Sequence, residues 1–348
     1  MNKTLLSTII IAAIPFCSQA AIDVTDNFSI SGFGSTSITQ SNNKTPLFVN
    51  REIADDTCYD CDTTFGLQAD WAIWDELSAS VQVVKRPQDN WSDPELEWAY
   101  LAYNYNNLSF KAGRLRLPLF LASEYYYVGQ AYTWARPPQE VYDSLLGFNY
   151  YDGLSVSWQY DLSDEIVLTA MPYYGFSNTN KMDYGSVTLE FDTDRITGIS
   201  FDISGFNYRV HMSYMNAKYR MIPSPTYDSL NFYTLGAEYS LDQWHFMAEV
   251  DADNLQTNWY ASASYNIDKF TPYVVYGESH QRRKSNSITT GVRYDITHTV
   301  SINAEWQNVF MDREDYNAGN SGQFVAPPIA YGEDKDAQLY TVMLNFIF

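Results

Sequence analysis

The last ten residues, 339–348, alternate between apolar and polar side chains in a pattern that few water-soluble folds can use. Successive side chains of a β-strand point to opposite sides, so the two sets lie on different faces. One face carries only apolar residues and ends on the aromatic carboxyl-terminal residue: Tyr340, Val342, Leu344, Phe346 and Phe348. The other face carries Thr341, Met343 and Asn345, which we expect to meet water. An apolar strip with aromatic ends is typical of the lipid-facing side of a transmembrane β-strand.

Several internal segments repeat this alternation, and the clearest are 154–162, 258–267 and 300–307. A soluble β-sandwich also alternates, but there the apolar face is a core and the polar face is the outside. Repetition over most of the chain, together with the terminal Phe348, favours an all-β fold: a transmembrane antiparallel up-and-down β-barrel. No internal apolar run is long enough for a transmembrane helix.

The amino end has the features of an export signal. Lys3 provides the positive charge, residues 5–16 are apolar, and 18–20 (Ser-Gln-Ala) offer the small residues that a signal peptidase requires. We therefore expect residues 1–20 to be a signal peptide that takes Cys17 with it. The mature chain would be a single domain, 21–348.

Walking along the chain gives sixteen predicted strands, an even number as a bacterial single-chain barrel requires. They are 28–40, 64–73, 77–86, 96–104, 108–115, 149–161, 166–176, 194–203, 206–219, 229–240, 243–254, 257–266, 270–280, 286–296, 299–311 and 337–348. Short turns alternate with long connections at 41–63, 116–148, 177–193, 218–228 and 312–336. We interpret 177–193 as a loop, although 186–191 has the pattern of a hairpin or a further strand, because a loop preserves the even count.

Composition narrows the functional classes. The 29 tyrosines and 9 tryptophans suit aromatic girdles at two membrane interfaces. Without Lys3, 42 acidic side chains stand against 20 basic ones, which argues against nucleic acid as a partner. Acidic loops either recruit divalent cations near lipopolysaccharide or simply form a solvated exterior.

Cys58 and Cys61 form a Cys-x-x-Cys in an acidic stretch. In an exported chain we expect a loop disulfide. A redox motif would need a βαβ context, and a zinc site would need two more ligands that no nearby histidine supplies. We therefore expect no metal site and no cofactor.

The connection 116–148 differs from the other loops. It is rich in Leu, Tyr and Trp and holds three prolines, so it should pack against a surface. Barrels of sixteen to eighteen strands leave an aqueous channel. Packing against the inner wall would bring Glu124, Glu140 and Asp143 into or near that channel.

With these features the chain resembles the Gram-negative porin superfamily. The resemblance covers the mature chain and rests on the export signal, residues 30–34 (Ile-Ser-Gly-Phe-Gly), the loop after the fifth strand, and Phe348. It implies a sixteen-stranded barrel, a homotrimer and a third external loop that folds inward to constrict the pore. It also implies that the barrel assembly machinery reads Phe348. The Leu-rich, double-proline form of the loop departs from the acidic loop of general porins.

The resemblance suggests a pore in which loop acids face basic wall residues. The loop candidates are Glu124, Arg136, Glu140 and Asp143, and the wall candidates are Lys85, Lys111, Arg114 and Arg116. Strict alternation points Arg114 and Arg116 at lipid, where a midplane arginine costs about 2–4 kcal/mol. We therefore expect a bulge or an exit from the membrane near Gly113. A basic wall and a set of interface arginines both remain open.

The expected function is passive diffusion of small hydrophilic solutes and ions across a Gram-negative outer membrane, in contact with membrane lipids and lipopolysaccharide. Acids outnumber bases on the polar faces of the strands, which predicts a weak cation preference. A substrate-selective channel remains an alternative, through loop aromatics for sugars or arginines for anions such as phosphate. An outer-membrane hydrolase using His211 and Ser213 is the alternative from another class, but two same-face residues are common in a polar lumen, so we expect no enzyme.

Overall fold

The computed structural model describes residues 21–87, 93–145, 148–184 and 187–348. The expected signal peptide, 1–20, lies outside these residues. Within the described chain, no helix combines the length and the apolar composition needed to cross a membrane.

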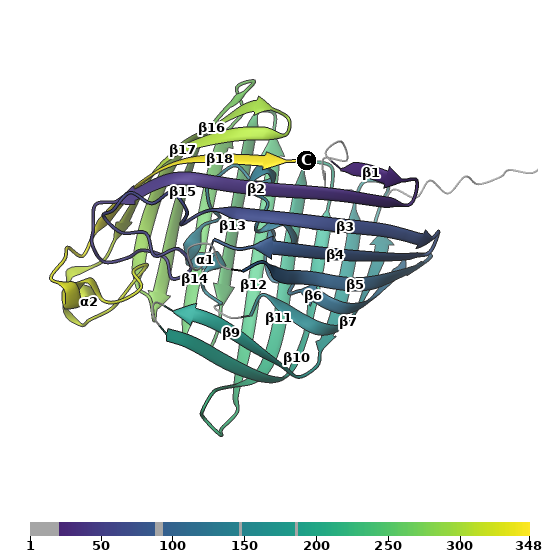
Figure 1. Ribbon diagram of the computed structural model, residues 1–348, viewed down its shortest axis with the longest axis horizontal. Coiled ribbons are helices and arrows are strands. Elements are labelled where there is room, and N and C mark those ends of the chain that lie inside the picture. Colours follow the sequence, from purple (N-terminus) through teal and green to yellow (C-terminus); the bar gives the residue numbers. More distant parts are fainter. Residues whose placement is uncertain (1–20, 88–92, 146–147, 185–186) are drawn as a thin grey trace, which may run out of the picture.

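The chain forms a closed antiparallel barrel of sixteen strands (Figure 1). In chain order these are β2 (Phe28–Ser41), β3 (Thr64–Trp74), β4 (Leu77–Lys85), β5 (Glu95–Tyr105), β6 (Leu108–Arg116), β7 (Tyr150–Asp161), β8 (Val167–Gly175), β10 (Val187–Ser204), β11 (Tyr208–Met221), β12 (Asp228–Leu241), β13 (Trp244–Ala252), β14 (Gln256–Tyr265), β15 (Phe270–Gln281), β16 (Ser285–Thr297), β17 (Val300–Phe310) and β18 (Ala337–Ile347). Strand β18 pairs with β2, with Val342 opposite Ile38, and this pairing closes the barrel. The predicted fold class is confirmed.

Two further strands lie outside the ring of sixteen. The short β1 (Ile22–Thr25) pairs with the start of β2. Strand β9 (Asn178–Tyr184) pairs with the first part of β10, so residues 187–193 belong to a hairpin and not to an irregular loop. The prediction of a loop over 177–193 was therefore wrong in its local structure. The barrel pairing of β10 with β8 ends at Ile196 and Gly175, so the earlier residues of β10 pair with β9, and the even count of barrel strands is preserved.

Side chains alternate between two different environments along each strand. On β18, Tyr340 and Val342 are each 52% exposed on the outer face, as the sequence predicted. On the opposite face Thr341 is 4% exposed and Asn345 is completely buried. The inner face was expected to meet water, but here it is covered by other parts of the chain.

Two long connections pack together at the end of the barrel opposite the short turns. Residues of 42–63 share a buried cluster with residues of 312–336 and the adjoining strand ends: Leu47, Phe48, Ile53, Cys61, Val309, Met311, Phe324, Ala337 and Leu339. The connection 312–336 contains α2 (Arg313–Asn317) and η3 (Pro328–Tyr331). In 42–63, Cys58 and Cys61 are joined by a disulfide. The turn that it closes leads directly into Asp62.

Candidate functional site

Segment 116–148 connects β6 to β7 and contains three short helices: η1 (Ser123–Tyr125), η2 (Gly129–Ala131) and α1 (Gln139–Tyr142). It exchanges hydrogen bonds with side chains of β11, β12, β13, β14, β16, β17, β18 and β2. These partners lie on the face opposite the exposed apolar side chains. In Figure 1, α1 is seen between strands drawn in front and strands drawn behind, and it contacts β13, β14 and β15.

Glu249 of β13 anchors the first half of this segment. Its carboxylate accepts a hydrogen bond from the backbone N–H of Leu121 at 2.8 Å and another from the hydroxyl of Tyr142. Tyr260 of the neighbouring β14 donates to the same carboxylate at 2.8 Å. Glu249 is 3% exposed, so its carboxylate has lost its contacts with water. These three donors supply the hydrogen bonds that water would have made.

Side chains of β16 and β17 hold the middle of the segment through its backbone. Arg293 donates to the carbonyl of Tyr132 at 2.6 Å, and Asn303 donates to the carbonyl of Thr133 at 2.7 Å. Glu305 accepts from the N–H of Ala135 at 3.1 Å. Three successive contacts of this kind fix the course of the backbone independently of its side chains.

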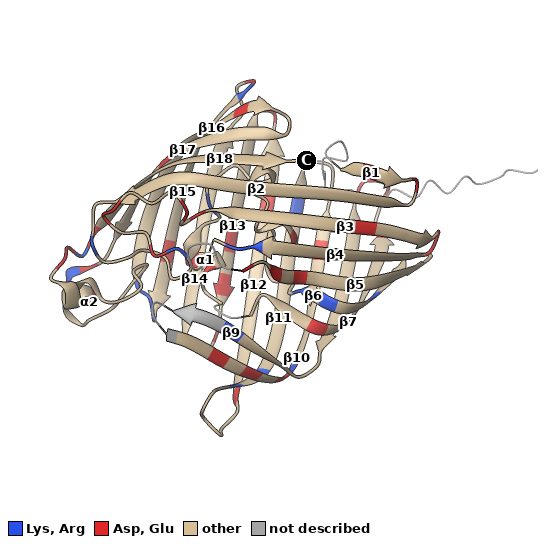
Figure 2. Ribbon diagram, in the orientation of Figure 1, with Lys and Arg blue, Asp and Glu red and all other residues tan. Residues whose placement is uncertain are grey.

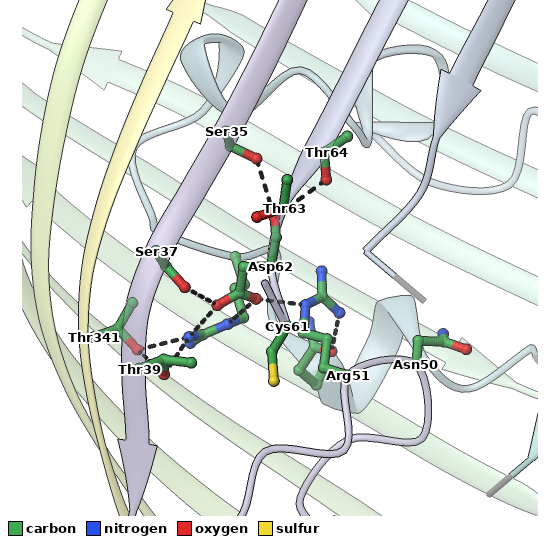
Figure 3. Close-up of polar contacts among 12 residues, drawn as sticks. Ser35, Ser37, Thr39, Asn50, Arg51, Cys61, Asp62, Thr63, Thr64 and Thr341 are labelled. Carbon is green, nitrogen blue, oxygen red and sulfur yellow. Dashed lines mark hydrogen bonds and ion pairs between the residues drawn. The ribbon is translucent and has the colours of Figure 1, made fainter. Parts of the chain in front are cut away.

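Asp62 joins three parts of the chain at one buried carboxylate (Figure 3). Arg136 donates to it from Nε at 2.8 Å and from Nη2 at 2.9 Å, and Arg51 donates from Nε at 2.8 Å. Ser37 of β2 adds a hydroxyl at 2.7 Å. Burial by itself would raise the pKa of this carboxyl, but Arg136, Arg51 and Ser37 lower it from 3.8 to about 2.

Arg136 also reaches the barrel wall on both sides of its closure. Nη2 lies 3.1 Å from the hydroxyl of Thr39 on β2 and 2.6 Å from that of Thr341 on β18. Nη1 lies 3.4 Å from Glu305 of β17. Arg136 is therefore a buried, fully engaged side chain and not an open pore-lining charge.

Glu140 of α1 and Asp143, the residue that follows α1, are also buried. Ser287 of β16 donates to Glu140 at 2.6 Å, and the Glu140 carboxyl lies over Gly277, where an added Cβ would come within 2.5 Å of its carbon. Burial raises the pKa of Glu140 above 4.5, against the opposing effect of Ser287. Burial likewise raises the pKa of Asp143 above 3.8, against the opposing charges of Arg51 and Arg283.

Glu124, in η1, is the fourth predicted loop residue, and it is exposed. The four predicted loop residues are therefore not brought together. Arg136 and Glu140 are buried with different partners, and Arg51 lies near both Asp62 and Asp143, whereas Glu124 keeps a free carboxylate.

The predicted wall residues also differ in burial and in their partners. Lys111 is half-buried, with its ammonium 5.0 Å from the ring centre of Tyr100. Lys85 is buried and donates to the carbonyl of Thr63 at 2.9 Å. Of these two, only Lys111 retains substantial exposure.

Arg114 and Arg116 behave differently from each other. Arg114 shares the outer face with Leu154 and pairs with Asp152 at 2.9 Å. Arg116, the last residue of β6, forms an ion pair with the buried Glu97, so the lipid-facing orientation that alternation predicted for it is wrong. The expected bulge near Gly113 is not found, because β6 pairs with β7 without a register shift from Leu108 to Arg116. The shift lies instead in β5, beside Glu97.

Most aromatic rings of the segment pack on one another or on the wall. Trp134 is 2% exposed and meets the ring of Tyr260 edge-on, with ring centres 5.6 Å apart. Tyr126 stacks on Tyr142 at 5.7 Å, and Phe120 packs against Tyr142 at 5.0 Å. These contacts leave little ring surface for a sugar, and they fix the segment.

Sequence reasoning missed Asp62, Arg51 and Glu97, which organise the charged networks. Asp62 follows Cys61 directly, and this proximity to the disulfide was the one available signal. Glu97 belongs to a strand irregularity that alternation cannot reveal.

One contact that a hydrolase site would need is present in the barrel. His211 Nδ1 lies 3.2 Å from Asp202 Oδ2, as in the orienting pair of a catalytic triad. However, His211 is 2% exposed and its Nε2 has no hydrogen-bond partner in the described chain, so no nucleophile is bonded to this imidazole.

Comparison with known proteins agrees with this architecture. The family model described as Gram-negative porin matches residues 7–314. The chain belongs to the Gram-negative porin family. It is therefore an outer-membrane β-barrel channel for small solutes.

The solved structures similar to this porin share its fold at low sequence identity. OmpF of Salmonella typhi, solved with daunomycin, is 14% identical with a TM-score of 0.64, covering 94% of this chain and 100% of that one. An anion-selective porin from Comamonas acidovorans is 13% identical, with a TM-score of 0.65 and coverages of 92% and 99%. The channel DcaP of Acinetobacter baumannii is 13% identical, with a TM-score of 0.59 and coverages of 94% and 100%. No curated protein sequence matches this porin.

Proposed function

We propose that this porin passes small hydrophilic solutes and ions passively, with a weak preference for cations, through a passage narrowed by segment 116–148. The observation that carries the proposal is the state of the charges on this segment. Arg136, Glu140 and Asp143 are buried, whereas Glu124 is exposed. A free carboxylate in a narrow aqueous passage raises the local cation concentration.

The charges on the inner wall of the barrel also favour cations. Partly exposed acids on inward-facing positions include Asp70, Asp202 and Glu238, whereas partly exposed bases include Lys111 and Arg209. Asp202 and Arg209 neutralise each other, with 2.7 Å between Nη2 and the carboxylate. Figure 2 shows that acidic and basic residues lie within the strands as well as in the connections.

The alternatives receive less support. The loop aromatics are mostly engaged in packing. An anion path would use Arg114, Arg116 and Arg136, but each of them is paired with a carboxylate: Arg114 with Asp152, Arg116 with Glu97, and Arg136 with Asp62. The buried imidazole of His211 gives a substrate no access. We assign the porin no catalytic step and no cofactor.

The test is the reversal potential of single channels in a planar bilayer under a KCl gradient. We expect a cation-favouring potential for the wild type. Glu124→Gln should lower the cation-to-anion permeability ratio about fourfold, because one charge at about 10 Å in water favours a cation, and disfavours an anion, by about a factor of two each. Glu333→Gln, in the outer connection 312–336, is the matched control. An anion-favouring wild type, or an E124Q variant indistinguishable from it, would contradict the proposal.

Membership of the porin family also supports proposals about the assembly of the protein and its binding partners. We propose a homotrimer in the outer membrane, in contact with lipopolysaccharide. We further propose that the barrel assembly machinery recognises the terminal Phe348, whose N–H and carbonyl pair with Gly32 of β2 at 2.9 and 2.8 Å.

A further inference from the structure

A pocket of about 510 Å³ opens at the end of the barrel that carries the short turns, which is the periplasmic end in bacterial barrels. Its lining combines one residue of segment 116–148 with the end of β16 and two short turns, before β15 and after β16: Gln130, Lys269, Arg293, Asp295, Ile296, Thr297 and His298. This pocket is separate from the networks around Asp62 and Glu140, and the proposed cation preference does not depend on it.

Arg293 forms a rigid part of the lining. Its Nε donates to Asp295 at 2.9 Å, and its Nη1 donates to the carbonyls of Gln130 at 3.1 Å and Tyr132 at 2.6 Å. Arg293 is 9% exposed, so the guanidinium is oriented before any ligand arrives. A preorganised donor binds with less loss of conformational entropy than a mobile one.

The Gln130 side chain is also fixed in orientation. Its Oε1 accepts from the hydroxyl of Ser301 at 2.6 Å, and its Nε2 donates to the carbonyl of His298 at 3.4 Å. The pocket wall therefore joins segment 116–148 to the short turn after β16.

Lys269 gives the pocket its uncompensated charge. Its ammonium donates to the carbonyl of Ile296 at 3.1 Å, and no carboxylate of the described chain forms an ion pair with it. Asp295 is already paired with Arg293. In a chain with 42 acidic and 21 basic residues, this pocket has two cations and an imidazole against a single acid.

We propose that this pocket binds a small oxyanion, a phosphate or a carboxylate, at the periplasmic mouth of the channel. Lys269 supplies the net charge, and Arg293, Thr297 and His298 supply further polar groups around it. Arg293 and Asp295 alternate with Tyr294, which pairs with the outer-face residue Phe270. The charged floor therefore lies on the lumen side, which a membrane lipid does not reach. The ligand is a free solute.

The experiment measures block of single-channel current by inorganic phosphate, and separately by acetate, added to one side of an oriented bilayer at constant ionic strength. We expect at least one of the two anions to reduce the current more strongly from the short-turn side than from the loop side. Lys269→Gln should raise the half-blocking concentration about tenfold, as loss of one charge-assisted hydrogen bond implies.

Lys284→Gln is the matched control, because Lys284 lies in a connection on the loop side and pairs with Asp315 at 3.2 Å. It should leave the block unchanged. Isothermal titration of the detergent-solubilised porin with the same anions provides a second readout that does not require current. Equal block from both sides, an unchanged K269Q variant, or the absence of block and of binding heat would overturn the proposal. Cation preference measured with E124Q would be unaffected by any of these outcomes.

Discussion

At the scale of single residues, Asp62 and Glu140 show how partners decide the role of a buried carboxyl. Both are at most 3% exposed. Asp62 has two arginines and a low pKa, whereas Glu140 has a serine hydroxyl and a raised pKa. Sequence alone could not separate these cases, because the main partner of Asp62 lies 74 residues away at Arg136. Of the four loop residues predicted to line the pore, Arg136, Glu140 and Asp143 are buried and bonded to other parts of the chain.

Asp62→Asn is expected to loosen segment 116–148. The substitution leaves Arg51 and Arg136 buried without their charged partner, a change that typically costs about 3–5 kcal/mol. We expect a lower unfolding temperature and larger fluctuations of single-channel current, because the docked state of the segment is weakened. Thermal unfolding and current noise in a planar bilayer measure the two effects.

The control for this variant is Asp56→Asn, which removes an exposed acid of the same connection. It should change neither quantity. If D62N had the same unfolding temperature and the same current fluctuations as the wild type, the buried ion pairs would not hold the segment.

At the scale of elements, the sequence predicted the barrel strands well because a membrane barrel imposes alternation on every one of them. It also identified 116–148 as a packed connection from its leucines and prolines. It allowed a hairpin at 186–191 but could not decide for it, because the pairing of residues 187–193 with β9 depends on where β8 ends. It could not predict the orientation of Arg116 either, since Glu97 comes from a different strand.

The element α1 should respond to pH. Glu140 and Asp143 have raised pKa values in the docked state because of burial. A carboxyl that binds its proton more tightly when docked stabilises docking as the pH falls from its raised pKa toward its ordinary value, 4.5 for Glu140. We therefore expect current fluctuations to decrease between pH 7 and pH 4.5, measured with the same single channels.

The ion pairs of Asp62 do not interfere in this range. Their contribution is present above pH 3.8 and is lost only as the pH falls toward about 2. Glu140→Gln carries an amide at every pH, so it should show a weaker response between pH 7 and pH 4.5. A wild-type current that became noisier on acidification, or an E140Q response equal to that of the wild type, would contradict this account of α1.

At the scale of the whole molecule, the barrel wall and its interior have different roles. The outer face is apolar, and the alternation of the last ten residues and of segments such as 154–162 and 258–267 predicted it. The inner face supports segment 116–148 through contacts with eight strands. The anchors described for segment 116–148 therefore all belong to its own chain.

This self-sufficiency makes a definite prediction about assembly. If three barrels associate as we propose, each should conduct independently, because the segment and its anchors belong to one chain. We expect insertion events in a planar bilayer to produce conductance in groups of three equal steps, and native mass spectrometry to give the mass of three mature chains. Single isolated steps together with a monomer mass would rule out the trimer but leave the channel intact. A trimer with one indivisible step would instead mean that the three passages merge, which the separate anchoring of each segment opposes.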